Sequence, residues 1–414
     1  MAQASLLAAS ATAPAKTDTI AEFNIVSGKV FDKQTSAPLV FAAINVVGTS
    51  IGTISNTEGE FVIKTPGNLK NYKLGFSSVG YESRFIDHND LLANESAIWL
   101  KAATIPINEV KIRDNNPQEL LKLAIEKYGE NYYAQPAELT AFYRETIKQQ
   151  RSYVAISEAI LDVYKAKYGN ANRDQLKLYK GRESLDVKKM DTIFFKLQGG
   201  PSSMLLMDVV SNSNMLLATD VFDYYEYNFA GTTIINDKLN YVIEFDQKES
   251  VKYPLYKGKI YLDEKNLAIA GIEFHLSERG IGMARDILVR KKPLTMKVDP
   301  LSAFYKLSYK EEDGQWYLSH ARSELVFKCN WKKRLFNSTY TVMSEMAITD
   351  RSTNNVKPYK PKEAMAQDDV FVENINKYYD EAFWEGFNYI KPEEPIEKAV
   401  ERINKKTRHR AGEN

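Results

Sequence analysis

The feature that most constrains the fold is a series of segments, beginning at residue 139, in which apolar and polar residues alternate and short turns intervene. Alternation with a period of two is typical of strands that bury one face. Strand-like segments joined by turns of a few residues form antiparallel hairpins. The expected pairs are 139–149 with 153–164, 257–262 with 269–276, 304–310 with 315–320, and 324–331 with 336–348. The sequence therefore predicts a large antiparallel sheet of successive hairpins.

Shorter strand-like segments, broken by turn residues, lie between residues 23 and 103. Val26 and Val30 share one face of the first segment, and Asn56-Thr57-Glu58-Gly59 forms a tight turn before the segment 60–64. About seven such segments fit into this stretch, and no helical pattern interrupts them. Strands at this spacing predict a small β-sandwich.

Helical patterns connect and end these two regions. A helix is expected between residues 104 and 130, capped by Asn115 or Asn116, with Pro117 in its first turn and Gly129 at its end. Its apolar stripe consists of Leu120, Leu121, Ala124 and Ile125. Further helical segments are expected around Met204–Val210, within Val370–Trp384 and over Glu393–Lys405.

The chain is therefore predicted to be mostly β, with four parts. These are a leader at residues 1–22, a β-sandwich at 23–103, a linker helix at 104–130, and an α+β domain at 131–414 with C-terminal helices. The leader is small and apolar from Ser5 to Ala13 and becomes polar after Pro14, which is typical of the end of a signal peptide or of a disordered stretch. The first interpretation predicts an exported protein, in the periplasm or associated with the outer membrane.

The first β region resembles a known family. The residues that carry the resemblance are Val26-Ser27-Gly28-Lys29-Val30, Pro38-Leu39, Ala42-Ala43-Ile44-Asn45-Val46, Gly48-Thr49, Ile51-Gly52-Thr53, Asn56, Glu58-Gly59-Glu60-Phe61 and Phe76-Ser77-Ser78-Val79-Gly80-Tyr81. In this order they are similar to the carboxypeptidase-regulatory-like, or prealbumin-like, domain that is common at the front of outer-membrane TonB-dependent transporters in Bacteroidota. The resemblance implies a seven-stranded prealbumin-like β-sandwich that is not itself catalytic. Ser36-Ala37 departs from the family, which usually has a glycine-containing turn there.

The second region resembles another group of proteins over a shorter stretch. Tyr256-Lys257-Gly258-Lys259-Ile260-Tyr261-Leu262-Asp263 and Ala268-Ile269-Ala270-Gly271-Ile272-Glu273-Phe274 are similar to the hairpins of periplasmic lipoprotein carriers. The resemblance implies a strongly curved half-barrel sheet with helices in its mouth. Its concave face would hold an apolar or lipid ligand. The residues expected to line that face are Tyr241, Ile243, Phe245, Ile260, Leu262, Ile272 and Phe274, unless a register shift by one exchanges them with their neighbours.

Composition and charge exclude several classes of function. The chain has 55 Lys and Arg residues against 54 Asp and Glu residues, a formal net charge of +1, and this balance argues against a nucleic-acid partner. A single cysteine, Cys329, excludes an intrachain disulfide and a thiolate metal cluster. The sequence contains no apolar run of the roughly 18–20 residues that a membrane-spanning helix needs.

Patterns associated with catalysis are weak. His275-Leu276-Ser277-Glu278 matches the His-x-x-Glu spacing of zinc carboxypeptidases, but a match of this length arises readily by chance and has no third ligand beside it. The sequence lacks a Gly-x-Ser-x-Gly motif, and Cys329 alternates with apolar residues as a packed thiol would. We therefore expect no catalytic residues, no metal and no cofactor.

The predicted function is that of a non-catalytic binding or interaction protein of the cell envelope. It would hold an apolar or lipid ligand in its curved sheet, or work with an outer-membrane transporter or another envelope protein. The alternative is a hydrolase whose site the sequence does not reveal. Of the 25 tyrosines and 19 phenylalanines, most are expected in the core and on sheet surfaces, although some could line a ligand site.

Overall fold

The computed structural model describes most of the chain. The described residues are 23–91, 96–104, 116–168, 174–185, 196–197, 200–212, 216–218, 220–284, 288–291, 296–331, 337–365, 371, 375 and 386–411. The predicted leader, most of the segment 104–115 and most of Val370–Trp384 lie outside them. Among the described helices, none is long and apolar enough to cross a bilayer.

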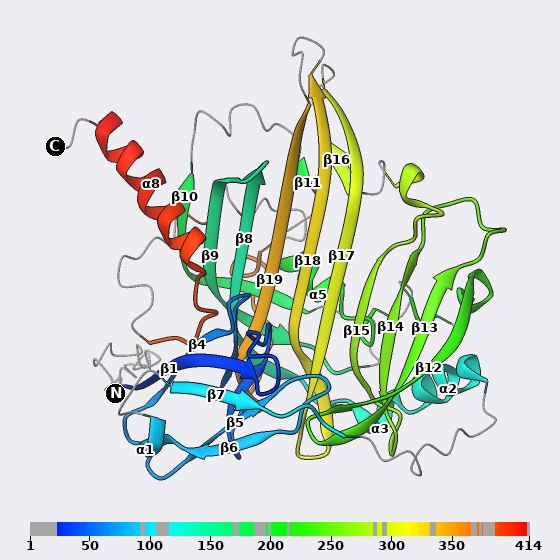
Figure 1. Cartoon of the computed structure of the whole chain (residues 1–414), viewed down its shortest axis with the longest axis horizontal. Coiled ribbons are helices and arrows are strands. Elements are labelled where there is room, and N and C mark those ends of the chain that lie inside the picture. Colours follow the sequence, from blue (N-terminus) through cyan, green and yellow to red (C-terminus); the bar gives the residue numbers. More distant parts are fainter. Residues whose placement is uncertain are drawn as a thin grey trace, which may run out of the picture.

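The N-terminal region forms the predicted β-sandwich (Figure 1). One sheet has the order β4-β1-β7, with β7 parallel to β1, and the other has the order β3-β2-β5-β6. The elements are β1 (Phe23–Asp32), β2 (Ala43–Val46), β3 (Gly52–Ile54), β4 (Glu60–Pro66), β5 (Lys73–Ser77), β6 (Arg84–Asp87), α1 (His88–Leu91) and β7 (Ser96–Leu100). Val26 and Val30 face inward as predicted, and they join a core that also contains Phe61 and Phe76. The mostly β class predicted from the sequence is confirmed.

Because the sandwich has a hydrophobic core separate from that of the large sheet, we expect residues 23–103 to fold alone as a soluble β-domain. Fourteen buried residues form the core, and every one of them lies within the fragment. A fragment of this length has a hydrophobic core sufficient for a marginally stable fold. Circular dichroism should show β structure and a cooperative thermal transition. A disordered fragment would contradict the domain boundary at residue 103.

The linker helix begins where the sequence predicts but ends earlier. In α2 (Pro117–Glu126) the Asn116 side chain accepts a hydrogen bond from the Gln118 amide at 3.0 Å, and Pro117 occupies the first turn. Gly129 was predicted to end this helix, and that prediction is wrong. The chain turns at Lys127 and continues as α3 (Tyr128–Asn131), which contains Gly129. The apolar stripe of α2 packs into the main core.

The second region contains one ten-stranded antiparallel sheet, with the order β10-β9-β8-β19-β18-β17-β15-β14-β13-β12. Its strands are β8 (Ala137–Gln149), β9 (Ser152–Lys165), β10 (Gln175–Leu185), β12 (Tyr225–Ile235), β13 (Lys238–Gln247), β14 (Tyr256–Asp263), β15 (Ile269–Leu276), β17 (Met296–Glu312), β18 (Gln315–Trp331) and β19 (Ser338–Ser352). Segments 315–320 and 324–331 were predicted as separate strands, and this was wrong. They form the single strand β18, because Ala321 and Ser323 continue its pairing with β17 without a break.

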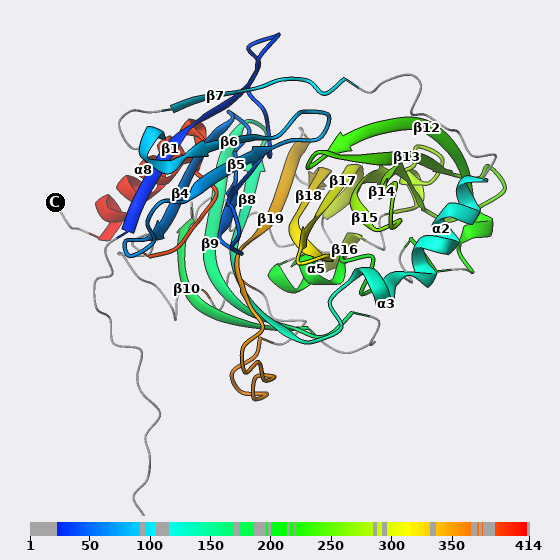
Figure 2. The same cartoon turned by 90° about the horizontal axis from the view of Figure 1, so that it is seen from below.

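The sheet is strongly curved, and its concave side encloses the main hydrophobic core (Figure 2). Helix α5 (Pro201–Leu206) lies inside the curve. A helix around Met204–Val210 was predicted; the observed one begins earlier, at Pro201, and ends before Asp208, whose side chain accepts hydrogen bonds from the Val210 and Ser211 amides. The remaining short elements are β11 (Lys196–Leu197), η3 (Phe222–Tyr224), η4 (Ile281–Met283) and β16 (Val289–Lys291).

A buried ionic cluster ties the segment after α5 to the sheet. The ammonium of Lys165 on β9 lies 2.6 Å from Asp174, 2.9 Å from Asp208 and 2.7 Å from the Ser211 hydroxyl. Tyr309 on β17 donates a hydrogen bond to Asp208 at 2.8 Å. Lys165 and Asp208 are almost completely excluded from solvent. The cluster therefore fixes the interior segment against two strands that lie far apart in the sheet.

The two regions are joined by a segment near the C-terminus, residues 386–393. The Asn388 side chain donates to the Lys64 carbonyl at 3.0 Å and accepts from the Lys64 amide at 2.6 Å, as a neighbouring strand would. β4 is an edge strand of its sheet, so this amide covers an otherwise open edge. On the other side, Arg144 of β8 donates to the Ile390 carbonyl at 2.7 Å. The chain then forms α8 (Glu394–Ala411), which contains the predicted helix Glu393–Lys405 except for its first residue.

Candidate functional site

A row of charged side chains crosses the large sheet on its outer face. The pairing registers place one member on each of nine consecutive strands, in the order Glu244, Lys259, Glu273, Lys306, Arg322, Glu345, Arg144, Glu158 and Arg182. We call this set the charge row. Opposite charges directly across a strand pair stabilise a sheet, whereas like charges destabilise it. The charges alternate in sign at every step except the step from Lys306 to Arg322.

The middle of the charge row is buried between the sheet, the sandwich and residues 386–393. Arg144 has no exposed surface, and its Nε lies 2.7 Å from Glu158. Glu158 also binds Arg182 at 2.6 Å, and Glu345 binds Arg322 at 3.1 Å. At the far end, Lys259 and Glu244 are about half exposed and lie 3.0 Å apart. Removing one partner of a buried pair should therefore cost much more unfolding free energy than removing one partner of the exposed pair.

Phe41 from the sandwich covers the step at which the alternation fails. Its ring centre lies 5.0 Å from the Arg322 guanidinium, 5.8 Å from the Lys306 ammonium and 5.5 Å from the centre of the His320 ring. The backbone of Phe41 has φ of 56°, which is rare for a bulky residue. Such conformations are concentrated at functional sites, and Phe41 adopts one where the two regions meet.

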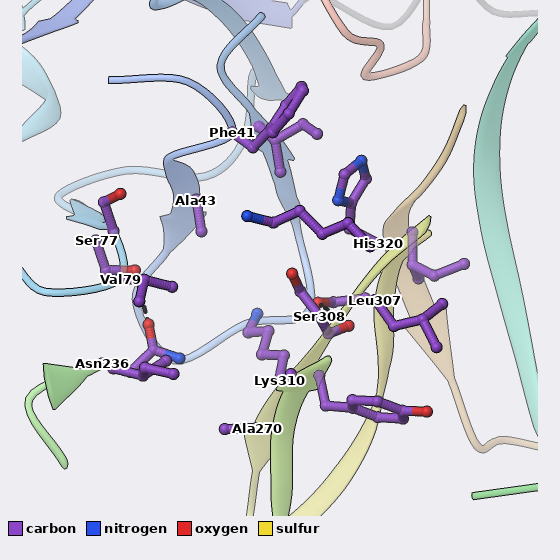
Figure 3. A pocket seen from close by; sticks show the side chains of 18 of the residues that line it. Phe41, Ala43, Ser77, Val79, Asn236, Ala270, Leu307, Ser308, Lys310 and His320 are labelled. Atoms are coloured by element: carbon purple, nitrogen blue, oxygen red, sulfur yellow. Dashed lines mark hydrogen bonds between the residues drawn. The ribbon is translucent and has the colours of Figure 1, made fainter. Parts of the chain in front are cut away.

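Next to Phe41 lies a cavity of about 90 Å3 between the sandwich and the sheet, which we call the junction cavity. Lys306, Ser308 and Lys310 alternate along β17 and form one wall, together with His320 from β18. Figure 3 shows Ala43, Ser77 and Val79 of the sandwich on the opposite side, with Asn236 beside them. A β-bulge between Ser308 and Tyr309 distorts the β17–β18 pairing here, and the Ser319 hydroxyl donates to the Ser308 carbonyl at 3.0 Å. Bulges of this kind often adjoin binding sites.

The ionisable groups of the junction cavity differ in how they are paired. Lys306 is paired with Glu273 at 2.5 Å. Lys310, in contrast, has no carboxylate within 4 Å among the described residues, and its ammonium makes one long contact of 3.5 Å to the Thr49 carbonyl. Burial lowers the pKa of Lys310, an effect that the nearby Glu312 and Asp350 only partly oppose. Of the two lysines in the cavity, Lys310 is therefore the one whose charge is less balanced by nearby carboxylates.

His320 is fixed in an ion-pair cluster. Its Nε2 lies 3.1 Å from Glu345, whose carboxylate also binds Arg322. Burial lowers the pKa of His320, more than the hydrogen bond to Glu345 raises it. Burial would raise the pKa of Glu345, but Arg322 and His320 bring it down to about 2. At neutral pH the pair is therefore a neutral imidazole beside a carboxylate.

The seven residues predicted to bind an apolar ligand share one face of the sheet. Ile243, Ile260 and Ile272 are cross-strand neighbours, and Phe245 and Phe274 flank Gly258 in the next row. Tyr241 and Leu262 are opposite each other. Six of the seven are buried in the main core, and Tyr241 is partly buried. They face the enclosed interior, on the other side of the sheet from the junction cavity, and their role in ligand binding stays a prediction.

Sequence reasoning missed the residues of the junction cavity. Lys306, Lys310 and His320 lie on two strands, and Phe41, which lies near them, belongs to another region more than 250 residues away in sequence. The alternation of Lys306, Ser308 and Lys310 was visible in the sequence, but alternating polar residues are typical of any solvent-facing strand. Only the docked sandwich distinguishes them.

The His-x-x-Glu match proves to be part of a surface ion pair, because Glu278 binds Lys257 from the neighbouring strand. In the described part of the chain, no three histidine, cysteine, aspartate or glutamate side chains are grouped as metal ligands would be. We therefore expect the same melting temperature with and without a strong chelator. Stoichiometric zinc in the purified protein, lost in the variant His275→Ala, would contradict this expectation.

Comparisons with solved structures return matches that are too weak to support an argument. A DUF1329 family protein from Desulfovibrio piger ATCC 29098 shares 13% identity, with 59% of this chain and 96% of that chain covered and a TM-score of 0.24. MucB, in a structure with MucA(peri), shares 11% identity, with 58% and 100% covered and a TM-score of 0.19. No curated protein matches the chain.

A family model provides the firmer comparison. The model of the CarboxypepD_reg-like domain matches residues 26–112. These residues include all but the first few of the sandwich and extend past its predicted end at residue 103. The resemblance drawn from the sequence is thereby confirmed for this part of the chain: residues 26–112 match the CarboxypepD_reg-like domain family.

Proposed function

We propose that this protein is a non-catalytic binding protein of the cell envelope, in the periplasm or associated with the outer membrane. In this proposal its ligand occupies the junction cavity, in contact with both the CarboxypepD_reg-like domain and the large sheet. The observation that carries the proposal is the cavity itself. Ligand sites lie preferentially at domain interfaces and combine apolar walls with a few convergent polar groups. Here Phe41 and Val79 supply apolar surface, and Lys310 and Ser308 supply polar groups.

The chemistry of the cavity favours binding over catalysis. A nucleophile needs a general base within hydrogen-bonding distance. The hydrogen-bond partner of His320 is Glu345, and the Ser319 hydroxyl is directed to the Ser308 carbonyl. Burial raises the pKa of Cys329 to about 12, so that its thiol stays protonated and packed in the core. These observations support a binding role rather than the alternative of a hydrolase.

A lipid ligand on the concave face, expected from the sequence, is a second proposal. The seven residues predicted for it already pack against one another and against the segment around α5. A lipid chain would therefore have to displace that segment, as happens when an apolar interior opens to accept a ligand. A protein partner in the outer membrane is a further proposal. It rests on the resemblance of the sandwich to a domain family that is common at the front of outer-membrane transporters.

The decisive experiment fills the junction cavity from either wall. The variants Ser308→Leu and Ala43→Leu each place a larger apolar side chain in the cavity, one from the sheet and one from the sandwich. A panel of neutral, anionic and lipid compounds, including a fluorescent fatty acid, is titrated into wild type and both variants while the melting temperature is followed. We expect compounds that stabilise the wild type to lose their effect in both variants.

Two outcomes would contradict the proposal. If the compounds that bind stabilise the filled variants as well as the wild type, the ligand occupies another place. If only the fatty acid binds, and equally to all three proteins, the concave face is the site and the junction cavity is not. A variant that loses its cooperative melt is replaced by the other one, because the two substitutions alter separate walls.

A further inference from the structure

We infer that the junction cavity is an oxyanion site, in which Lys310 binds the carboxylate or phosphate group of a small molecule over Ser308. This inference rests on the proposed function and names the class of ligand. Lysine ammonium groups and serine hydroxyls are the side chains that bind such groups as point donors. The inference is carried by three observations, which concern the compensation of charge, the interruption of the charge row, and the size of the cavity.

The first observation is that Lys310, at the domain junction, has no carboxylate within 4 Å of its ammonium among the described residues. Uncompensated charges in partly buried positions are costly, and proteins usually pair them. The charged groups that face Lys310 are Glu312, Asp350 and Arg351. Glu312 is 3.4 Å from Arg351, and Asp350 accepts hydrogen bonds from the Ser50 hydroxyl and the Arg351 amide. Both carboxylates act on Lys310 only from a distance, so an anion in the cavity would supply the direct counter-charge that neither of them provides.

The second observation is that the charge row lacks a negative member at the cavity. Lys306 and Arg322 are direct cross-strand neighbours of like charge, and the carboxylate that pairs with each of them lies on the strand beyond, Glu273 for Lys306 and Glu345 for Arg322. Lys306 lies four residues before Lys310 on the same face of β17, so the two side chains flank Ser308. An oxyanion over Ser308 would lie between two lysines and close to the only step of the row where the alternation of charges fails.

The third observation is the size and lining of the cavity. One water molecule needs about 10–15 Å3 of such space, so the cavity of about 90 Å3 holds a ligand of roughly six to nine non-hydrogen atoms. That size suits a small organic acid or a phosphate, and it is too small for a lipid chain. The Ser77 and Ser319 hydroxyls on the lining already donate to the Asn236 side chain and to the Ser308 carbonyl, so the donor that can add to Lys310 and Ser308 is the amide group of Asn236.

The test uses inorganic phosphate and succinate as probes, on the full-length protein, with sodium chloride at matched ionic strength as the reference. Isothermal titration calorimetry measures the affinity of wild type, Lys310→Met and the control Lys328→Met. The control removes the same charge from an exposed position on β18 of the same sheet. We expect saturable binding of at least one probe, at least 10-fold weaker in Lys310→Met and unchanged in Lys328→Met. The probe that binds decides between a phosphate and a carboxylate ligand.

The outcomes separate this inference from the proposed function. If neutral compounds bind the wild type, lose their effect in Ser308→Leu and Ala43→Leu, and bind Lys310→Met as well as wild type, the cavity is a ligand site but not an oxyanion site. If both probes bind with equal affinity to wild type and Lys310→Met, the inference is wrong as well. If no compound of any class depends on the cavity, both the inference and the proposed function fail.

Discussion

The variant Arg144→Met should lose about 3–5 kcal/mol of unfolding free energy, the range measured when one partner of a buried ion pair is removed. Arg144 has no exposed surface, and it donates to Glu158 and to the Ile390 carbonyl. Without it, Glu158 keeps only Arg182, and the carbonyl loses its donor in a buried position. Methionine has a comparable length and leaves little cavity. The lost free energy therefore measures the cost of leaving Glu158 and the Ile390 carbonyl without this donor. Urea denaturation at pH 7 measures it.

The charge row provides its own control for this prediction. Lys259→Met removes a cation from the exposed end of the same row, where its partner Glu244 is also about half exposed, and it should cost less than about 1 kcal/mol. The double variant Arg144→Met/Glu158→Leu should recover part of the loss, because it removes the unpaired carboxylate together with the cation. A loss for Arg144→Met as small as that of Lys259→Met would show that the buried centre of the row contributes little.

The variant Lys165→Met should show a loss of similar size, about 3–5 kcal/mol, because it leaves Asp208 buried without its cation. Tyr309 and Ser211 would still donate hydrogen bonds to Asp208, but neutral donors do not replace a buried counter-charge. The exposed pair of Lys101 and Glu82 offers the matched control, and Lys101→Met should change stability by less than about 1 kcal/mol. Equal losses in the two variants would contradict the prediction.

The same cluster predicts how stability depends on pH. Burial by itself would raise the pKa of Asp208, but Lys165, with the hydrogen bonds from Tyr309 and Ser211, brings it below its usual value. A depressed pKa in the folded state gives stability that is present above the unfolded pKa and is lost as the pH falls through the folded value. Burial raises the pKa of Asp174, the other carboxylate beside Lys165, which gives the opposite dependence.

We take Asp208 as the dominant partner, because it is completely buried and has three side-chain donors. The wild type should therefore lose more stability between pH 7 and the acidic range below about pH 4 than the variant Asp208→Asn does. Urea denaturation of both proteins across this range measures the difference. Parallel curves for the two proteins would show that Asp208 does not titrate differently in the folded and unfolded states.

The parts of the fold that were predicted correctly depend on local patterns. Hairpins such as β8–β9 and β14–β15 join segments that are adjacent in sequence, and their alternation and turn residues are visible without knowledge of the rest. The pairing of β8 with β19 joins residues about 200 positions apart, which no local pattern indicates. The seven residues expected on the concave face share one face of the sheet for a related reason: within one hairpin the period of two fixes which residues share a face.

The charge row and the junction cavity could not be predicted, because both depend on register between distant strands. Each member of the row is an ordinary charged residue in its own strand, and the alternation of signs is visible only across nine strands. Phe41 and Lys310 come together only because the sandwich docks on the outer face of the sheet. The sequence also suggested a boundary at Gly129 where none exists, since Lys127 already turns the chain.

Because Asn388 covers the edge of β4, the sandwich must wait during synthesis for a segment that emerges much later. A ribosome releases the sandwich some 280 residues before the segment that covers its edge strand. Through that interval the Lys64 amide and carbonyl face solvent or another chain, and open strand edges are where nascent chains pair wrongly. This late contact closes both the edge of β4 and, through Ile390, the site around Arg144, before α8 emerges and packs on β9 and β10. Chaperone capture of nascent chains should accordingly persist until residues 386–393 have emerged.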